Sequence, residues 1–195
     1  VFSIVSVLFI RFLPTVGAAI QSPSTIAHSV IESLPVMGGG GVIARGLKKS
    51  VESLSPYVAG AIGEGTISGG LAAEQVRQQT DEGTLTPGQA AASFASGVGT
   101  AAFGAAGGRI AKKLGVADID TLLAGGGTNA TSKGVARRII EGGITEGVFE
   151  ELPQSLQEQI WQNAALGKPL LEGVPESGAM GMLAGGVMGG VAGGL

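Results

Sequence analysis

The sequence has no cysteine and a single histidine, His28. Disulfides, thiolate metal ligands and cysteine nucleophiles are therefore excluded, as are the histidine clusters that bind zinc. Aromatic residues make up 4% of the chain and charged residues 14%, whereas about 25% of the residues of an ordinary soluble domain are charged. The net charge is −3, so the chain has no overall positive field for nonspecific nucleic-acid binding.

Glycine, by contrast, is abundant. It supplies 36 of the 195 residues, more than twice the average share of about 7%. The mean hydropathy of +0.39 is too high for a disordered chain, yet lower than that of a continuous bundle of membrane spans. This composition indicates a chain that can exist in water and in membranes. Because it starts at Val1 and stops at Leu195 within an apolar helical pattern, we expect a piece of a larger protein.

The pattern predicts an all-α chain, because no segment keeps the apolar–polar alternation of a half-buried strand. Breaks at glycine, proline and polar residues separate helices that we expect over residues 24–35, 65–80, 87–113, 135–163 and 175–195. The predicted architecture is glycine-rich helical hairpins packed into an extended or oligomeric helical assembly. Its expected segments are an apolar leader helix or interfacial segment (1–21), a helical segment with a glycine-rich break at 38–41 (22–59), a helical hairpin with a small-residue apolar helix (60–124), a flexible linker (125–134), and an amphipathic helix followed by a glycine-zipper helix (135–195).

The final helix carries the strongest pattern, two rows of glycine at steps of four residues. Each glycine inside a helix costs about 1 kcal/mol relative to alanine, so this segment would be unstable as an isolated helix in water. Small residues at every fourth position let two backbones approach closely, as in membrane helix pairs. Tight packing in a soluble protein and a flexible tail are the alternatives. The predicted helix-packing positions are Gly181, Gly185, Gly189 and Gly193 in one row, Gly186, Gly190 and Gly194 in the other, and Gly97, Gly104 and Gly108 in a weaker pattern within 84–108.

Two short basic groups follow apolar, glycine-rich stretches. Cations near the carboxyl end of a helix complement its dipole, and Arg or Lys beside an apolar helix suits the headgroup boundary of a membrane. Ordinary solvated helix ends are the alternative interpretation. The predicted membrane-interface residues are Arg45, Lys48 and Lys49 in the first group and Arg109, Lys112 and Lys113 in the second.

The segment 146–163 has an amphipathic pattern. Phe149, Leu152, Leu156 and Ile160 mark its apolar face; the polar remainder comprises Glu146, Glu150, Gln154, Gln157 and Glu158. Pro153 is expected to kink the helix or to start a new one. Glu150 and Glu151 could be taken for acid–base machinery, but no histidine or nucleophile accompanies them, so we expect a solvated face. We predict no catalytic, cofactor-binding or metal-binding residue in the chain.

The run 140–155, the run 158–163 and the glycine-rich segment that begins at Gly181 resemble a segment of internal virion proteins, also called ejection proteins, of short-tailed bacteriophages. The resemblance is clearest over 137–190. It implies a protein that rides inside the capsid, leaves ahead of the genome and assembles a conduit across the host envelope. Many such proteins carry a separate lysozyme-like or transglycosylase domain. Nothing here matches such a domain, so the chain itself is not expected to be an enzyme.

The same resemblance sets the expected partners and location. Partners would be other copies of the chain, other phage core, portal or tail proteins, and host membrane lipids, with passing contact with phage DNA; no cofactor or small-molecule substrate is expected. The protein would lie in the virion interior and then in the host cell envelope. The alternatives are a tail tape-measure-type structural protein and a glycine-zipper bacterial membrane or pore-forming protein.

Overall fold

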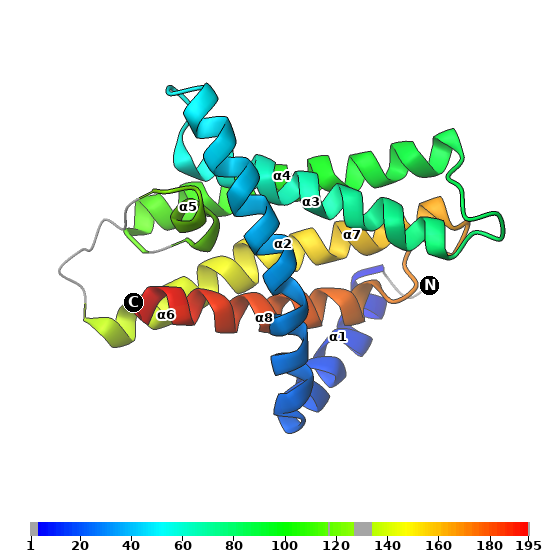
Figure 1. Ribbon diagram of the computed structural model, residues 1–195. Helices are drawn as coiled ribbons and strands as arrows, with labels where there is room; N and C mark the ends of the chain where they lie inside the picture. The colour runs from blue at the N-terminus through cyan, green and yellow to red at the C-terminus, as the bar shows by residue number, and fades with distance from the viewer. Residues whose placement is uncertain (1–3, 117, 127–133, 195) are drawn as a thin grey trace.

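A computed structural model describes residues 4–116, 118–126 and 134–194 (Figure 1). All regular elements within them are helical, which confirms the all-α prediction. Most of the expected linker at 125–134 lies outside the described residues. The elements are α1 (Ile4–Gln21), α2 (Pro23–Ser50), α3 (Pro56–Gln78), α4 (Pro87–Leu114), the short α5 (Ile119–Leu123), α6 (Val135–Ile144), the π-helix η1 (Thr145–Glu151), α7 (Leu152–Ala165) and α8 (Val174–Gly194).

The helices form a bundle crossed by one long helix. α3 and α4 lie side by side, and α6, η1 and α7 follow one another along α8 (Figure 1). α4 also contacts η1 and α7, so the two halves of the bundle share an interior. α2 crosses the bundle and contacts both α3 and α8, while α1 contacts α8.

Local signals explain where α4 begins and ends. Thr86 Oγ1 accepts a hydrogen bond from the Gln89 amide, and the Gln89 side chain accepts one from the Thr86 amide. This capping box satisfies two amides that no helical carbonyl can reach, and Pro87 fits the first turn because it has no amide to satisfy. Gly115 ends the helix in the left-handed conformation at φ 66°, which glycine adopts without strain.

The predicted break at Gly38–Gly41 is wrong, because α2 continues through all four glycines. The glycines serve close packing instead. A Cβ added to Gly40 would lie 3.0 Å from the backbone nitrogen of Glu64 in α3, and one added to Gly41 would lie 3.0 Å from Leu123 Cβ. Tertiary contacts therefore offset the low helix propensity of this run.

The single helix expected over 135–163 is divided into α6, η1 and α7. Pro153 lies in the first turn of α7, in agreement with the expectation that it would kink the helix or start a new one. Proline lacks an amide and its ring clashes with the carbonyl four residues earlier. The wider turns of a π-helix before the proline accommodate both effects, and such turns are frequent at functional sites.

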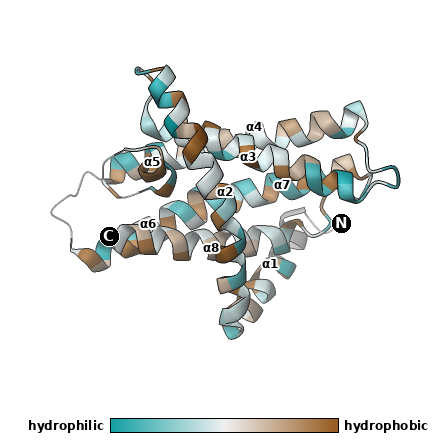
Figure 2. Cartoon of the chain, viewed as in Figure 1, coloured by the Kyte–Doolittle hydropathy of each residue, from teal (hydrophilic) through white to brown (hydrophobic). Residues whose placement is uncertain are grey.

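The interior of this bundle is built from small residues. Ten of the fourteen buried hydrophobic residues described are alanine, and none is Leu, Ile, Phe, Tyr or Trp. Bulky apolar side chains lie outside, with Phe94 73% and Val42 71% exposed. Figure 2 shows hydrophobic positions spread along the helices, including α2 where it crosses the bundle. The helices therefore pack backbone to backbone, and the bundle buries little bulky side-chain surface.

Candidate functional site

The two glycine rows of α8 have different surroundings. The row from Gly181 to Gly193 faces α6, η1 and α7 of the same chain: a Cβ added to Gly185 would lie 2.7 Å from Glu151 Cβ, and one added to Gly189 would lie 2.6 Å from Glu146 Cβ. The other row packs against α6 less tightly. The nearest atoms to an added Cβ lie 3.7, 3.6 and 3.5 Å away at Gly186, Gly190 and Gly194, which is ordinary van der Waals contact with Gly143 and Ile139.

The three glycines predicted in α4 lie at close contacts as well. A Cβ added to Gly97 would lie 2.9 Å from Gly69 Cα of α3, and one added to Gly108 would lie 2.8 Å from Tyr57 Cβ. Gly104 faces carboxylates: an added Cβ would lie 2.9 Å from Glu64 Oε2 and 3.1 Å from a carboxylate oxygen of η1. The backbone of α4 therefore lies against α3 on one side and against acidic groups at its centre.

The predicted interface cations lie near the carboxyl ends of α2 and α4. Arg45 Nε donates a hydrogen bond of 2.8 Å to the carbonyl of Leu123 in α5. The Lys112 ammonium lies 5.7 Å from the centre of the Tyr57 ring, within the range of a cation–π contact. Lys48, Lys49 and Lys113 share the last turns of these helices. Their contact with lipid stays a prediction.

The predicted solvated face at 146–158 is wrong. Glu146, Glu150 and Gln154 are only 6%, 3% and 2% exposed, whereas Phe149 is 45% exposed. The glycines of α4 and α8 explain this reversal. They leave room beside their backbones, and that room is filled by the long polar side chains of η1 and α7. The segment thus buries the polar side chains of Glu146, Glu150 and Gln154, while Leu152 and Leu156 of its apolar face still contact Gly178 of α8.

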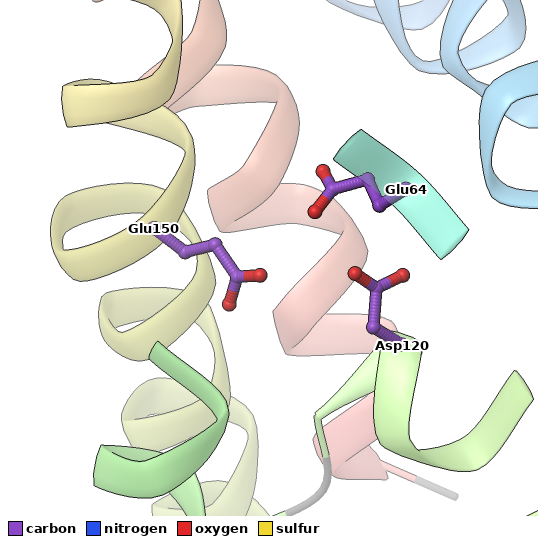
Figure 3. Close-up of side chains that lie close together, drawn as sticks. All are labelled: Glu64, Asp120 and Glu150. Carbon is purple, nitrogen blue, oxygen red and sulfur yellow. The ribbon is translucent and has the colours of Figure 1, made fainter. Parts of the chain in front are cut away.

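Five carboxylates from three parts of the chain meet in this interior, and we call them the carboxylate cluster. They form two triads, each with one oxygen per residue lying within 4.8 Å of the others. Glu64, Asp120 and Glu150 form the first triad, and Figure 3 shows their side chains pointing toward a common space. Asp118 and Glu146 form the second triad with the same Glu150. Glu150 is therefore the shared member.

Backbone and amide donors hold part of the cluster in place. Glu146 Oε1 accepts from the Ile119 amide at 2.9 Å, and Asp118 Oδ2 accepts from the Thr121 amide at 2.9 Å. Gln154 Nε2 donates to Glu64 Oε2 at 3.2 Å. Other oxygens of the cluster are buried without a hydrogen-bond partner, namely Asp118 Oδ1, Asp120 Oδ2 and Glu150 Oε2.

No described Lys or Arg forms an ion pair with the cluster; the ion pairs between described residues involve other acids. Burial is the larger cause, and repulsion from neighbouring carboxylates the next, of pKa values for Glu64, Glu146 and Glu150 that lie well above the ordinary value for glutamate. Burial and the charge of Asp118 raise the pKa of Asp120 to about 6. The cluster therefore favours the uptake of positive charge, as protons or as a cation.

Two further acids lie close enough to the cluster to act on its charge. Glu151 and Glu158 line a cavity between α2, α3, α7 and α8 whose other lining residues include serines and glutamines. Glu158 Oε1 accepts a hydrogen bond of 2.5 Å from Thr100 Oγ1. Burial and the charge of Glu158 raise the pKa of Glu151 to about 8. Both acids also repel the carboxylate of Glu64, so they extend the acidic interior toward this cavity.

The sequence pattern did not indicate Glu64, Asp118 or Asp120 as site residues. For Glu64, one local signal was available. Glu64 lies between Gly63 and Gly65 within a long stretch free of other charges, and an acid flanked by glycines in such a stretch is unusual on a solvated helix. Asp118 and Asp120 carry no comparable signal, because a short acidic helix start is common.

The cluster offers oxygen ligands only, which suits hard ions such as Ca²⁺ and Mg²⁺ rather than zinc or copper. Comparisons of the chain with models of protein families, with curated proteins and with solved structures found no match.

Proposed function

We propose that this chain is a structural protein of a bacteriophage virion that leaves with the genome and forms part of a helical conduit in or across the host cell envelope. Its partners would be further copies of itself, other virion proteins and membrane lipid. The resemblance at 137–190 supports the phage context. The placement of small residues inside the bundle and bulky apolar residues outside supports contact with a membrane.

That separation is the observation on which the proposal rests. Burial of one bulky apolar side chain stabilises a fold by about 1.5–3 kcal/mol, yet this bundle buries alanine and leaves the bulky groups outside. Ile10, Leu13 and Ile31 are each more than 60% exposed on α1 and α2. Apolar surface of this kind marks a site for a membrane or another protein. Small residues inside and bulky residues outside are typical of helices that pack in lipid.

α2 is the segment that we propose to cross the membrane. It is the one described helix long and apolar enough to do so by length and composition. A core helix of a soluble protein can pass the same test, but only 11% of the relevant window is buried. With 28 residues α2 extends about 42 Å, enough for a hydrocarbon core of about 30 Å. Arg45, Lys48 and Lys49 would then lie at one headgroup boundary.

The outer face of α8 supports assembly with other copies. Val187 and Val191 are 46% and 63% exposed there, and Gly186, Gly190 and Gly194 beside them are half-buried in ordinary contact with α6. A second helix could pack against this face beside α6, as the small residues next to the two valines permit. Glycine-rich helical hairpins packed into an oligomer are part of the proposal on this basis.

Flotation of the purified chain with phospholipid vesicles tests the membrane contact. Ile31→Asp adds a charge beside Glu32 within the part of α2 that we propose to enter the membrane, and a charge within such a span costs up to about 2.5–3.5 kcal/mol on insertion. The bound fraction should correspond to an affinity about 100-fold weaker. Ser24→Asp, which adds the same charge to the exposed first turn of α2, is the control and should bind as the wild type does.

Equal flotation of Ile31→Asp and the wild-type chain would contradict insertion of α2. If the wild-type chain does not float with the vesicles at all, the proposed contact with membrane lipid is wrong. Dye release from the same vesicles then reports whether bound chains form a conduit, and size measurements in detergent report whether they do so as oligomers.

A further inference from the structure

The space between the carboxylates has the dimensions of an ion site. Calcium binds oxygen ligands at about 2.3–2.6 Å, so oxygens on opposite sides of one ion lie roughly 4.6–5.2 Å apart. The ligand oxygens of Glu64, Asp120 and Glu150 lie within 4.8 Å of one another, and so do those of the second triad. Three carboxylates in either triad could therefore contact a single ion with little movement.

The hydrogen bonds of the cluster divide its oxygens into two kinds. Asp118 Oδ2 is fixed by the amide of Thr121, which leaves Asp118 Oδ1 buried without a partner. Glu150 is 3% exposed, and its Oε2 has no partner either. A buried polar atom without a partner costs about 1–3 kcal/mol, and outer donors that orient a ligand are typical of metal sites. Buried acceptor oxygens of this kind favour the approach of a positively charged group.

Glycines in α4 make room for the shared ligand. A Cβ added to Gly107 would collide with Glu150 Oε2, and one added to Gly104 would lie 3.1 Å from Glu150 Oε1. Both glycines are buried in the middle of a helix, where each lowers helix stability by about 1 kcal/mol relative to alanine. The backbone of α4 thus leaves room for both oxygens of the Glu150 carboxylate. No described Lys or Arg neutralises that carboxylate.

Near neutral pH, the charge of the cluster favours a divalent cation over protons as its occupant. Fully ionised, the five carboxylates carry five negative charges, and one divalent cation would neutralise two of them. Protons can serve as well, but each of them neutralises one carboxyl group and attracts none of the others as strongly. A divalent ion is attracted to all three carboxylates of a triad at once, and its attraction is stronger in a buried site than in water. Glu151 and Glu158, whose charges also act on Glu64, line the polar cavity.

We propose that the carboxylate cluster is a site for hard divalent cations, calcium foremost, with Glu150 as the ligand shared by its two triads. The ligand set is oxygen only and strongly acidic, as such ions require. Bound calcium replaces repulsion between α3, α5 and η1 with attraction, and so holds the bundle together. Loss of the ion loosens those three elements at neutral pH.

Calorimetric titration of the 195-residue chain with CaCl₂ at about pH 7.5, after removal of metal with EDTA, tests the site without lipid. Saturable binding is expected below about 1 mM, the weakest affinity of natural calcium modules. Glu150→Gln keeps the shape of the side chain and removes its charge, so it should weaken binding at least tenfold. Glu82→Gln, which removes one charge from an exposed loop, should leave the affinity unchanged within twofold.

A second pair of variants leaves every carboxylate in place. Gly107→Ala should displace Glu150 and weaken binding at least tenfold, whereas Gly70→Ala, whose added methyl meets nothing within 4 Å, should bind as the wild type does. Circular dichroism establishes that each variant is folded, and Glu146→Gln replaces Glu150→Gln if the latter is not. The midpoint of thermal unfolding should rise with calcium for the wild type and both controls.

Absence of saturable binding up to about 10 mM CaCl₂, ten times the weakest expected dissociation constant, would overturn the proposal. So would equal affinity of Glu150→Gln and Glu82→Gln, since binding would then reflect the overall negative charge. These results do not depend on vesicles, so failure of the membrane proposal and failure of the cation site are separate outcomes.

Discussion

Asp120→Asn should stabilise the metal-free chain near neutral pH, although it removes a buried acid. In the folded chain the pKa of Asp120 is raised from 3.8 to about 6, first by burial and then by the charge of Asp118. The folded state therefore retains a proton that the unfolded state releases. The contribution of Asp120 to the free energy of unfolding is therefore greatest below pH 3.8 and is lost as the pH rises through about 6. Asparagine has no such charge to bury, and its amide can donate to Glu64.

The size of the effect follows from the shift. One pKa unit corresponds to about 1.36 kcal/mol, so the charged form of Asp120 destabilises the fold by about 3 kcal/mol above pH 6. Asp120→Asn should regain up to this amount at about pH 7.5 and almost nothing at about pH 3.5. For a chain of this size about 1 kcal/mol shifts the unfolding midpoint by roughly 2–4 °C. The expected gain is therefore roughly 6–12 °C.

Thermal and urea unfolding followed by circular dichroism, in buffer with EDTA, measures this difference at both pH values. Asp81→Asn, on an exposed loop, is the control and should change the midpoint little at either pH. A midpoint that falls at pH 7.5, or a gain as large at pH 3.5 as at pH 7.5, would refute the assignment of a buried and repelled carboxylate. An equal gain in Asp81→Asn would attribute the effect to net charge alone.

Three further outcomes are expected from the same unfolding assay. The wild-type midpoint in EDTA should fall as the pH rises from about 4.5 to about 8, because the pKa of Glu151 is raised to about 8 in the fold; a rising midpoint would contradict the buried cluster. Gly189→Ala should destabilise the chain because its methyl meets the side chain of Glu146, whereas Gly190→Ala should be neutral or stabilising by up to about 1 kcal/mol; equal effects would mean that the two rows of α8 have equivalent surroundings. Thr86→Ala removes a cap and should cost about 1 kcal/mol; an unchanged midpoint would show that α4 does not need its capping box.

Local signals predicted the parts of the fold that depend on neighbouring residues. The start of α4 could be predicted because Thr86 and Pro87 act on amides within one turn. The break at Gly38–Gly41 could not be judged from the run alone, since the contacts that stabilise a helix there come from Glu64 and Leu123, more than 20 residues away in the sequence. Helix propensity is a weak guide wherever tertiary contacts decide.

The carboxylate cluster was missed for a related reason. The hydrophobic pattern of 146–163 places Phe149 inside and Glu150 outside, as in most soluble helices. That inference assumes that neighbouring helices present bulky apolar side chains. Here α4 presents Gly104 and Gly107, and α8 presents Gly185 and Gly189, so long acidic side chains reach into the space beside those backbones. The orientation of an amphipathic helix thus depends on which surface lies opposite to it.

The glycines and the carboxylates have a common consequence for stability. An interior of alanine and glycine buries little bulky apolar surface, and so gains little of the hydrophobic stabilisation on which soluble bundles depend. Five acids, four of them buried and one partly buried, destabilise the same interior whenever they lack protons or a cation. The folded state should therefore depend on its surroundings more than that of an ordinary domain: on pH, on divalent ions and on a surface that covers the exposed bulky side chains. A chain with these dependences would unfold readily when they are withdrawn and fold again when they are restored, which is the behaviour that passage through a narrow channel followed by assembly at a membrane would require.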